Sequence, residues 1–156
     1  MHTRRTILGA AGLSGAALAW PVSLSAADTY TIRMTTSGAP GPSQRMRFEP
    51  DLLVVAPGST IRFVPSAPGH NSQTTPGMLP VGAATWRIGF GKPGTVTLSQ
   101  PGYYGYHCLP HRSLGMVGLI IVTGEGMRDN LAAARAIKHP GKAQARWDKL
   151  WARAKV

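Results

Sequence analysis

The stretch GYYGYHCLPHRSLGMVGLIIV, residues Gly102–Val122, carries most of the fold information in the chain. Its first part alternates, with Tyr104, Tyr106 and Cys108 at every second position, and its last part, Gly118–Val122, is continuously apolar. Period-two alternation predicts a strand with one buried face, and a short apolar run beside a turn predicts a fully buried strand. The stretch therefore predicts two neighbouring strands joined by a short polar loop.

Further strand-like runs stand upstream, separated by Gly and Pro. They are Thr29–Thr35, Leu52–Val55, Thr60–Val64 and Thr95–Leu98. The 156 residues include 19 Gly and 13 Pro, which argues against a helical bundle. Several short strands with this punctuation predict an all-β sandwich or barrel. The stretch 66–94 is the least regular, and we expect it to form loops over one end of the sandwich.

After residue 123 the pattern changes from strands to helices. Asp129–His139 contains no Gly or Pro, and Asp129 or Asn130 can cap its start. After Pro140 and Gly141, the run Lys142–Lys155 places two tryptophans and a leucine at helical spacing. We therefore expect a β-sandwich over 28–123, and over 124–156 an extension of two helices whose tryptophans pack on that sandwich.

Residues 1–27 have the three-part layout of an export signal. Arg4 and Arg5 precede the uncharged run Gly9–Trp20, and small residues such as Ser25 and Ala27 follow. The arginine pair indicates a twin-arginine signal, and the run is shorter than the ~20 residues that a spanning helix needs. Cleavage after Ala27 or Ala26 predicts a periplasmic protein without a membrane span, which we expect to be a monomer.

Composition limits the chemistry further. A single cysteine excludes an internal disulfide and a Cys-x-x-Cys redox pair. The formal charge of +11 points to partners with an acidic surface, although eight of the 17 basic residues lie beyond residue 123. Asp148 interrupts the basic residues of the last helical run, so we expect no nucleic-acid partner.

Four residues form a candidate metal site. Cys108, His111 and Met116 lie in the loop between the last two strands, and His70 lies upstream in the sequence Pro-Gly-His-Asn. One thiolate, two imidazoles and a thioether are the donor set of a blue-copper centre. Each residue alone has an ordinary structural interpretation, and the spacing of the set favours the metal. His107 precedes Cys108 on a strand, so its side chain points to the opposite face.

The pattern Cys-x-x-His-x-x-x-x-Met, followed by Val-Gly-Leu-Ile, resembles the ligand loop of the cupredoxins. Its spacing is similar to that of plastocyanins and pseudoazurins, and it is shorter than the loop of azurins. The two C-terminal helices and the sequence Met-Arg-Phe-Glu-Pro at 46–50 favour the pseudoazurin family. The resemblance implies a cupredoxin Greek-key sandwich with one copper ion per chain, cycling between Cu(I) and Cu(II), on His70, Cys108, His111 and Met116.

The resemblance also implies roles around the metal. Asn71 is expected to form hydrogen bonds near the Cys108 sulfur, and Met46 to lie beside His111. Pro110, together with Leu114, is expected to form an apolar collar around the His111 edge. Basic residues expected to face a partner are Arg45, Arg47, Lys92 and Arg112; the family favours lysine at such positions.

The expected function is one-electron transport in the periplasm, without enzymatic activity. By the same resemblance, the acceptor is a nitrite reductase of denitrification, and the donor is a c-type cytochrome or a quinol-oxidising complex. Two alternatives keep the copper: a copper-delivery protein, and a plastocyanin- or amicyanin-like carrier for another partner. A third is an enzyme with Cys108 as nucleophile and His111 as base.

Overall fold

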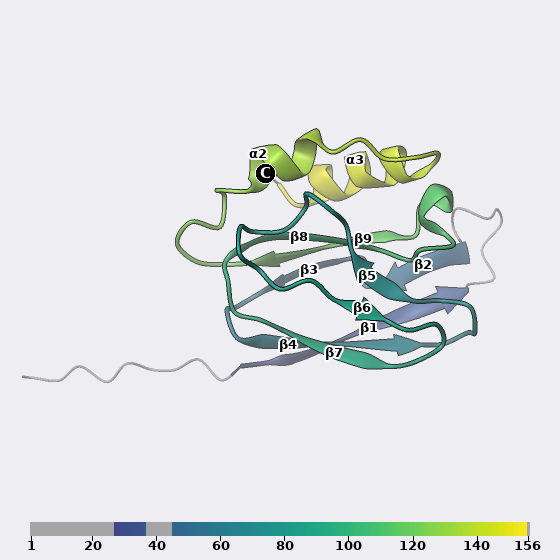
Figure 1. The fold of residues 1–156 in the computed structure, drawn as a ribbon. Helices are drawn as coiled ribbons and strands as arrows, with labels where there is room; N and C mark the ends of the chain where they lie inside the picture. Colours follow the sequence, from purple (N-terminus) through teal and green to yellow (C-terminus); the bar gives the residue numbers. More distant parts are fainter. Residues whose placement is uncertain (1–26, 37–44, 156) are drawn as a thin grey trace, which may run out of the picture.

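Two β-sheets face each other, and two C-terminal helices cover the outer face of one of them (Figure 1). The computed structural model describes residues 27–36 and 45–155. The predicted export signal lies outside these ranges except for Ala27. Within them, neither the length nor the hydropathy of any helix is sufficient for a membrane span.

The first sheet has the strand order β2-β1-β4-β7. Strands β1 and β4 run parallel, and the other two pairs are antiparallel. Ile32 and Phe63 are paired in register and fully buried. The strands are β1 (Thr29–Thr36), β2 (Met46–Glu49), β4 (Ser59–Pro65) and β7 (Gly94–Leu98).

The second sheet has the order β3-β9-β8-β5-β6. Its strands are β3 (Leu52–Val55), β5 (Ser72–Thr74), β6 (Arg87–Ile88), β8 (Gly102–His107) and β9 (Val117–Val122). The prediction that 66–94 forms only loops was wrong, because β5 and β6 lie within it. Strands of three and two residues are too short to show a period in the sequence. They form by pairing, β5 with β8 and β6 with β5.

Strands β8 and β9 are buried at every position because both faces of their sheet are covered. Tyr104 and Tyr106 point into the core between the sheets, whereas Tyr103 packs under the helices. In β9, Ile120 faces the first core and Leu119 the second. Since successive side chains of a strand point to opposite faces, this explains why β9 reads as a continuous apolar run.

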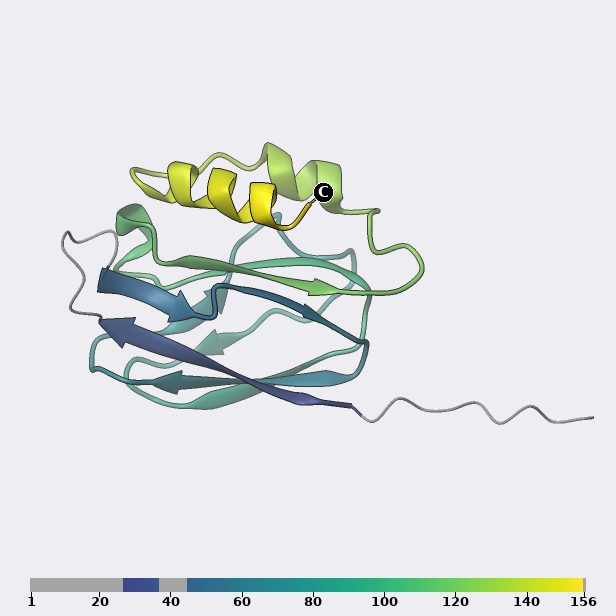
Figure 2. The same cartoon turned by 180° about the vertical axis from the view of Figure 1, so that it is seen from behind.

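Helices α2 (Leu131–Ala136) and α3 (Ala143–Arg153) lie side by side over the second sheet (Figure 2). Trp147, Leu150 and Trp151 turn toward the sheet and are buried against Tyr103. Helix α2 is shorter than expected. Asn130 occupies its N-cap position, but its side chain makes no capping bond. Instead its amide donates to the Tyr103 carbonyl at 2.8 Å and accepts from the Tyr103 amide at 3.0 Å, which fastens α2 to β8.

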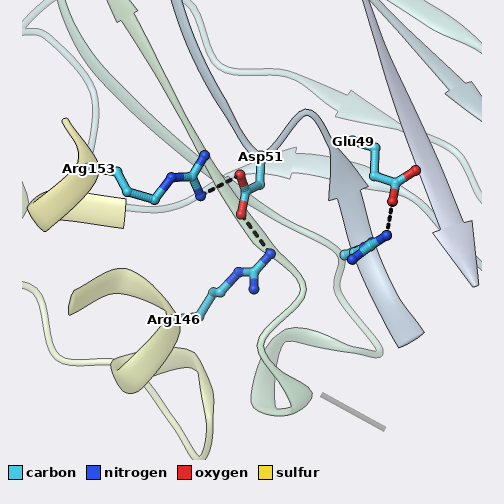
Figure 3. A network of polar contacts seen from close by, with 5 residues as sticks. Glu49, Asp51, Arg146 and Arg153 are labelled. Atoms are coloured by element: carbon cyan, nitrogen blue, oxygen red, sulfur yellow. Dashed lines mark hydrogen bonds and ion pairs between the residues drawn. The ribbon is translucent and has the colours of Figure 1, made fainter. Parts of the chain in front are cut away.

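An ion-pair network fastens α3 to the start of β3 (Figure 3). Arg146 and Arg153 donate to different oxygens of Asp51, at 2.6 and 2.9 Å. The Asp51 carbonyl accepts from the Leu119 amide of β9 at 2.8 Å. One buried aspartate thus joins the last helix to the edge of the second sheet.

Candidate metal centre

The ligand loop, which we define as Cys108–Met116, connects β8 to β9 and closes on itself through backbone hydrogen bonds. The Cys108 amide donates to the Met116 carbonyl at 3.0 Å, and the Met116 amide donates to the His111 carbonyl at 3.1 Å. The 3-10 turn η1 (Arg112–Leu114) lies between His111 and Met116. These bonds hold the three predicted ligands of the loop at the same end of the sandwich.

Three of the four predicted ligands converge on one point. The Nδ1 atoms of His70 and His111 are 3.2 Å apart, and the Cys108 Sγ lies 3.4 Å from Nδ1 of His111 and 3.9 Å from that of His70. Bonds of about 2.0 Å to nitrogen and 2.3 Å to sulfur place trigonal donors roughly 3.5 to 3.8 Å apart. Within 27–36 and 45–155, no other three His, Cys, Asp or Glu side chains group in this way. The donor set and its spacing therefore fit a copper ion.

Met116 is fully buried in the same core cluster as Cys108. Its backbone bonds to Cys108 and His111 bring the residue to the loop end nearest both. A neutral thioether from this position would be the weak fourth donor of a blue-copper site. The role of Met116 as a ligand stays a prediction.

His70 lies between β4 and β5, with only 1% of its surface exposed. Its Nε2 lies 2.8 Å from the Thr36 hydroxyl, and that hydroxyl donates to the Met46 sulfur at 3.6 Å. A hydroxyl that donates to Met46 is left to accept from Nε2, and this arrangement assigns the ring proton to Nε2. Nδ1 then faces Cys108 and His111 with a free lone pair, which is the form that binds a metal.

Asn71 connects the two segments that carry the predicted ligands. Its Oδ1 accepts a hydrogen bond from the Leu109 amide at 2.7 Å, and its Nδ2 donates to Gln73 at 3.2 Å. The backbone amides of Asn71 and His111 donate to the Cys108 sulfur. The sulfur is therefore held by hydrogen bonds from both segments.

Burial sets the protonation of the site without metal. Burial raises the pKa of the Cys108 thiol, and the hydrogen bonds from the backbone amides of Asn71 and His111 offset part of this increase. Burial also lowers the pKa of both histidines, and for His70 the neighbouring His111 adds to the effect. The imidazoles are thus neutral and ready to bind, whereas metal binding has to displace the thiol proton.

Sequence reasoning missed the polar neighbours of the site. His107 is 2% exposed, and its ring nitrogens lie 2.9 Å from the Thr75 hydroxyl and 3.2 Å from Gln73 Nε2. Burial, followed by the charges of Arg112 and His139, lowers its pKa to about 4. No local pattern marks Thr36, Gln73 or Thr75, since each lies more than 30 residues from its histidine.

The surface around His111 is mixed in character. His111 is half-buried, Pro110 is exposed, and Leu109 keeps 46% of its surface in solvent. Of the residues expected to face a partner, Lys92 and Arg45 are exposed and Arg112 is half-buried. Arg47 forms an ion pair with Glu49 within β2, so part of its charge is neutralised. Leu114 is half-buried.

Known proteins resemble this chain in sequence and in fold. A model of the plastocyanin/azurin family of copper-binding proteins matches residues 36–123. Pseudoazurin of Methylorubrum extorquens is 39% identical over 127 residues, covering 81% of this chain and 82% of the relative. That of Paracoccus pantotrophus is 38% identical over 122 residues, covering 78% and 81%. The chain is a cupredoxin of the pseudoazurin family. The crystal structure of pseudoazurin from Methylobacterium extorquens matches this cupredoxin with a TM-score of 0.74 and 38% identity, covering 81% of this chain and 99% of that chain.

Family membership settles the class of function. This cupredoxin is a copper-binding electron carrier and not an enzyme. The all-β fold with two C-terminal helices, predicted from the sequence, is confirmed. Its partners are accordingly redox proteins.

Proposed function

We propose that this chain carries single electrons in the periplasm, on copper held by His70, Cys108, His111 and Met116, and delivers them to a nitrite reductase of denitrification. The observation that carries the proposal is the triangle of two Nδ1 atoms and one Sγ, whose corners differ in burial. His70 and Cys108 are at most 1% exposed, whereas His111 reaches the surface. Electrons can then enter and leave by one edge.

Copper bound here would supply a one-electron couple between Cu(I) and Cu(II). The chain's own contribution is to hold the donors nearly still. Thr36 orients the His70 ring, the two backbone amides fix the Cys108 sulfur, and the closed ligand loop fixes His111 relative to Met116. Little has to move when the charge changes, so the electron is exchanged quickly.

Charge around the site supports a partner with an acidic surface. The sequence contains no Asp or Glu from residue 52 to residue 124, the segment that includes all four predicted ligands. Lys92 lies beside Gly91, whose amide bonds to the His70 carbonyl at 2.8 Å, and Arg112 follows His111. Long-range attraction guides such a partner, and exposed Leu109 and Pro110 give it an apolar contact that dissociates readily.

The periplasmic location rests on the export signal read in residues 1–27, and we propose that this signal is removed to leave a sandwich over 28–123 and a helical extension over 124–156. Residues 27 and 28 precede β1 directly. Removal of residues 1–27 would leave all of β1 in the mature chain. Export of the full-length chain, and the mass of its mature form, test this part of the proposal.

The ligand assignment is tested by adding Cu(II) to the purified mature chain. Thiolate-to-copper charge transfer should give intense visible absorption, and Cys108→Ser should abolish it while retaining the fold. Met116→Leu should keep the colour and change the reduction potential, because it removes only the weak donor. A colourless wild-type protein, or a coloured Cys108→Ser protein, would overturn the assignment.

The partner is tested by electron transfer from the reduced chain to a copper nitrite reductase at several salt concentrations. Lys92→Glu should slow the second-order rate at low salt. The matched control is Arg62→Glu, which makes the same charge change at an exposed position in β4. Equal rates for both variants, or a wild-type rate that ignores salt, would contradict the proposed steering. Fast copper transfer without electron transfer would favour a delivery protein.

A further inference from the structure

The first residues of α3 contact the ligand loop directly. The Lys142 amide donates a hydrogen bond to the Ser113 carbonyl at 2.8 Å. Ser113 lies in η1, between His111 and Met116, and in both views α3 begins above this turn (Figures 1 and 2). This hydrogen bond joins the N-cap residue of α3 to the ligand loop.

Glycine makes the approach between helix and loop possible. Gly141 has φ +54, and a Cβ at this position would lie 2.6 Å from the Ser113 carbonyl oxygen. On the loop side, a Cβ on Gly115 would lie 3.5 Å from the Lys142 carbonyl oxygen and 3.7 Å from the Cβ of Arg146. A side chain at 141 would push the backbones of the helix start and of the loop apart. A side chain at 115 would make an ordinary van der Waals contact with the helix.

The helix that makes this contact is itself fixed. Arg146, one turn after Lys142, donates to Asp51 at 2.6 Å, and Arg153 donates to the same carboxylate. Trp147 and Leu150 are fully buried against the second sheet. Since Ser113 is exposed and η1 has no buried residue, the turn has little packing of its own. Besides the loop's own backbone hydrogen bonds, the turn is therefore positioned from outside, by a packed and ion-paired helix.

We infer that α3 is a positioning element of the metal centre: through the Lys142 amide and the Ser113 carbonyl, it limits how far His111 and Met116 can move relative to each other. The inference rests on the ligand set of the proposed function. The helices then do more than cover the sheet. Loss of the contact should loosen the loop before it unfolds the sandwich.

The test compares Lys142→Pro with Lys142→Ala in the full mature chain. Lys142 has φ −76, which suits proline, but the proline ring removes the amide hydrogen and faces the Ser113 oxygen. Lys142→Ala keeps the amide and is the matched control. Amide hydrogen exchange of the metal-free chain is measured at Cys108 and Met116, whose amides bond within the loop, and at Thr123, whose amide bonds to Val55 at 2.9 Å.

For Lys142→Pro we expect exchange at Cys108 and Met116 to be about fivefold faster, the effect of one net hydrogen bond, with Thr123 unchanged. In the copper-loaded chain, release of copper to a chelator should accelerate by a similar factor, and Lys142→Ala should match wild type in both assays. Unchanged loop exchange, or equal acceleration at Thr123, would overturn the inference because it would show no role or only global destabilisation.

Gly141→Ala provides a second variant if Lys142→Pro does not fold. Its Cβ would displace Ser113 while the Lys142 amide remains, so the loop amides should again exchange faster than Thr123. The metal-free exchange also separates this inference from the proposed function. A wild-type chain that binds no copper would refute the ligand set, and the exchange result would still decide whether α3 holds the loop.

Discussion

The carboxylate of Asp51 should contribute more to stability than any exposed ion pair of this fold. Its side chain is 8% exposed and accepts two charge-assisted hydrogen bonds, from Arg146 at 2.6 Å and from Arg153 at 2.9 Å (Figure 3). Asp51→Asn keeps the size of the side chain and removes its charge and one acceptor oxygen. Both guanidinium groups would then lose their charged partner at the junction of α3 and β3, and one of them would lose its acceptor.

The expected loss of stability depends on how exposed each arginine side chain is to solvent. The Arg146 side chain is 27% exposed, so its bond to Asp51 should contribute about 1.5 to 2.5 kcal/mol. Arg153 is 53% exposed, and its pair should contribute at most about 0.5 kcal/mol. Asp51→Asn should therefore lower the free energy of unfolding by about 2 to 3 kcal/mol, since the arginines can still turn to solvent.

The assay is denaturant unfolding of the metal-free chain, with double-mutant cycles of Asp51→Asn against Arg146→Met and Arg153→Met. The matched control is Glu49→Gln, the same chemical change in an ion pair whose two side chains are each 38% exposed, which should cost about 0.5 kcal/mol or less. The reasoning would be refuted if the coupling to Arg153 equalled that to Arg146, or if Asp51→Asn cost no more than the control.

Three further outcomes are expected. Thr36→Val removes the hydroxyl that holds His70 Nε2, so copper affinity in a chelator competition should fall about 10- to 100-fold, and an unchanged affinity would deny Thr36 this role. Burial and then Arg112 lower the pKa of His139 to about 4, below the ~6.5 of an unfolded histidine, so the unfolded chain binds the extra proton. The contribution of His139 to stability should thus be complete above pH 6.5 and be lost toward pH 4. Because the pKa of His107 is also lowered to about 4, His139→Gln should remove part of this fall, measured by denaturant unfolding across that range. Copper loading should raise the Tm of the wild type in thermal unfolding and leave that of Cys108→Ser nearly unchanged, because only the native chain binds the metal tightly.

Strands with a clear alternation or an apolar run were predictable from the sequence, and strands of two or three residues were not. Leu52–Val55 is β3 as expected, and the alternating run from residue 102 is β8. Strand β5 exists because β8 offers it backbone partners, and β6 because β5 does so in turn, which no local pattern reveals. Helix α2 was placed correctly but ends early, and Asn130 bonds to Tyr103 of β8 instead of capping the helix. In both cases tertiary contacts outweigh local preference.

The residues of the site also include some that the sequence predicted and some that it did not. Cys108, His111 and Met116 lie within nine residues, so their spacing alone suggested a metal site. His70 lies far upstream, so its assignment rested on the sequence Gly-His-Asn and on the resemblance to cupredoxins. Thr36, Gln73 and Lys142 have no signature, because each acts through a contact that exists only in the folded chain. Spacing in the sequence can indicate ligands that share a loop, but not the distant groups that hold them.

Those distant groups set the separations of the three donor atoms. The site is held from three parts of the sequence: Thr36 at the end of β1 fixes the ring of His70, Asn71 holds the start of the ligand loop at Leu109, and Lys142 at the start of α3 holds its middle at Ser113. Thr36 ends a paired strand, Asn71 is buried, and Lys142 precedes a helix that packs on the second sheet, so the loop has few directions in which to relax. A site built in this way costs little ordering free energy when the metal binds and changes little when an electron is gained or lost. The C-terminal helices therefore belong to the electron-transfer machinery as well as to the core.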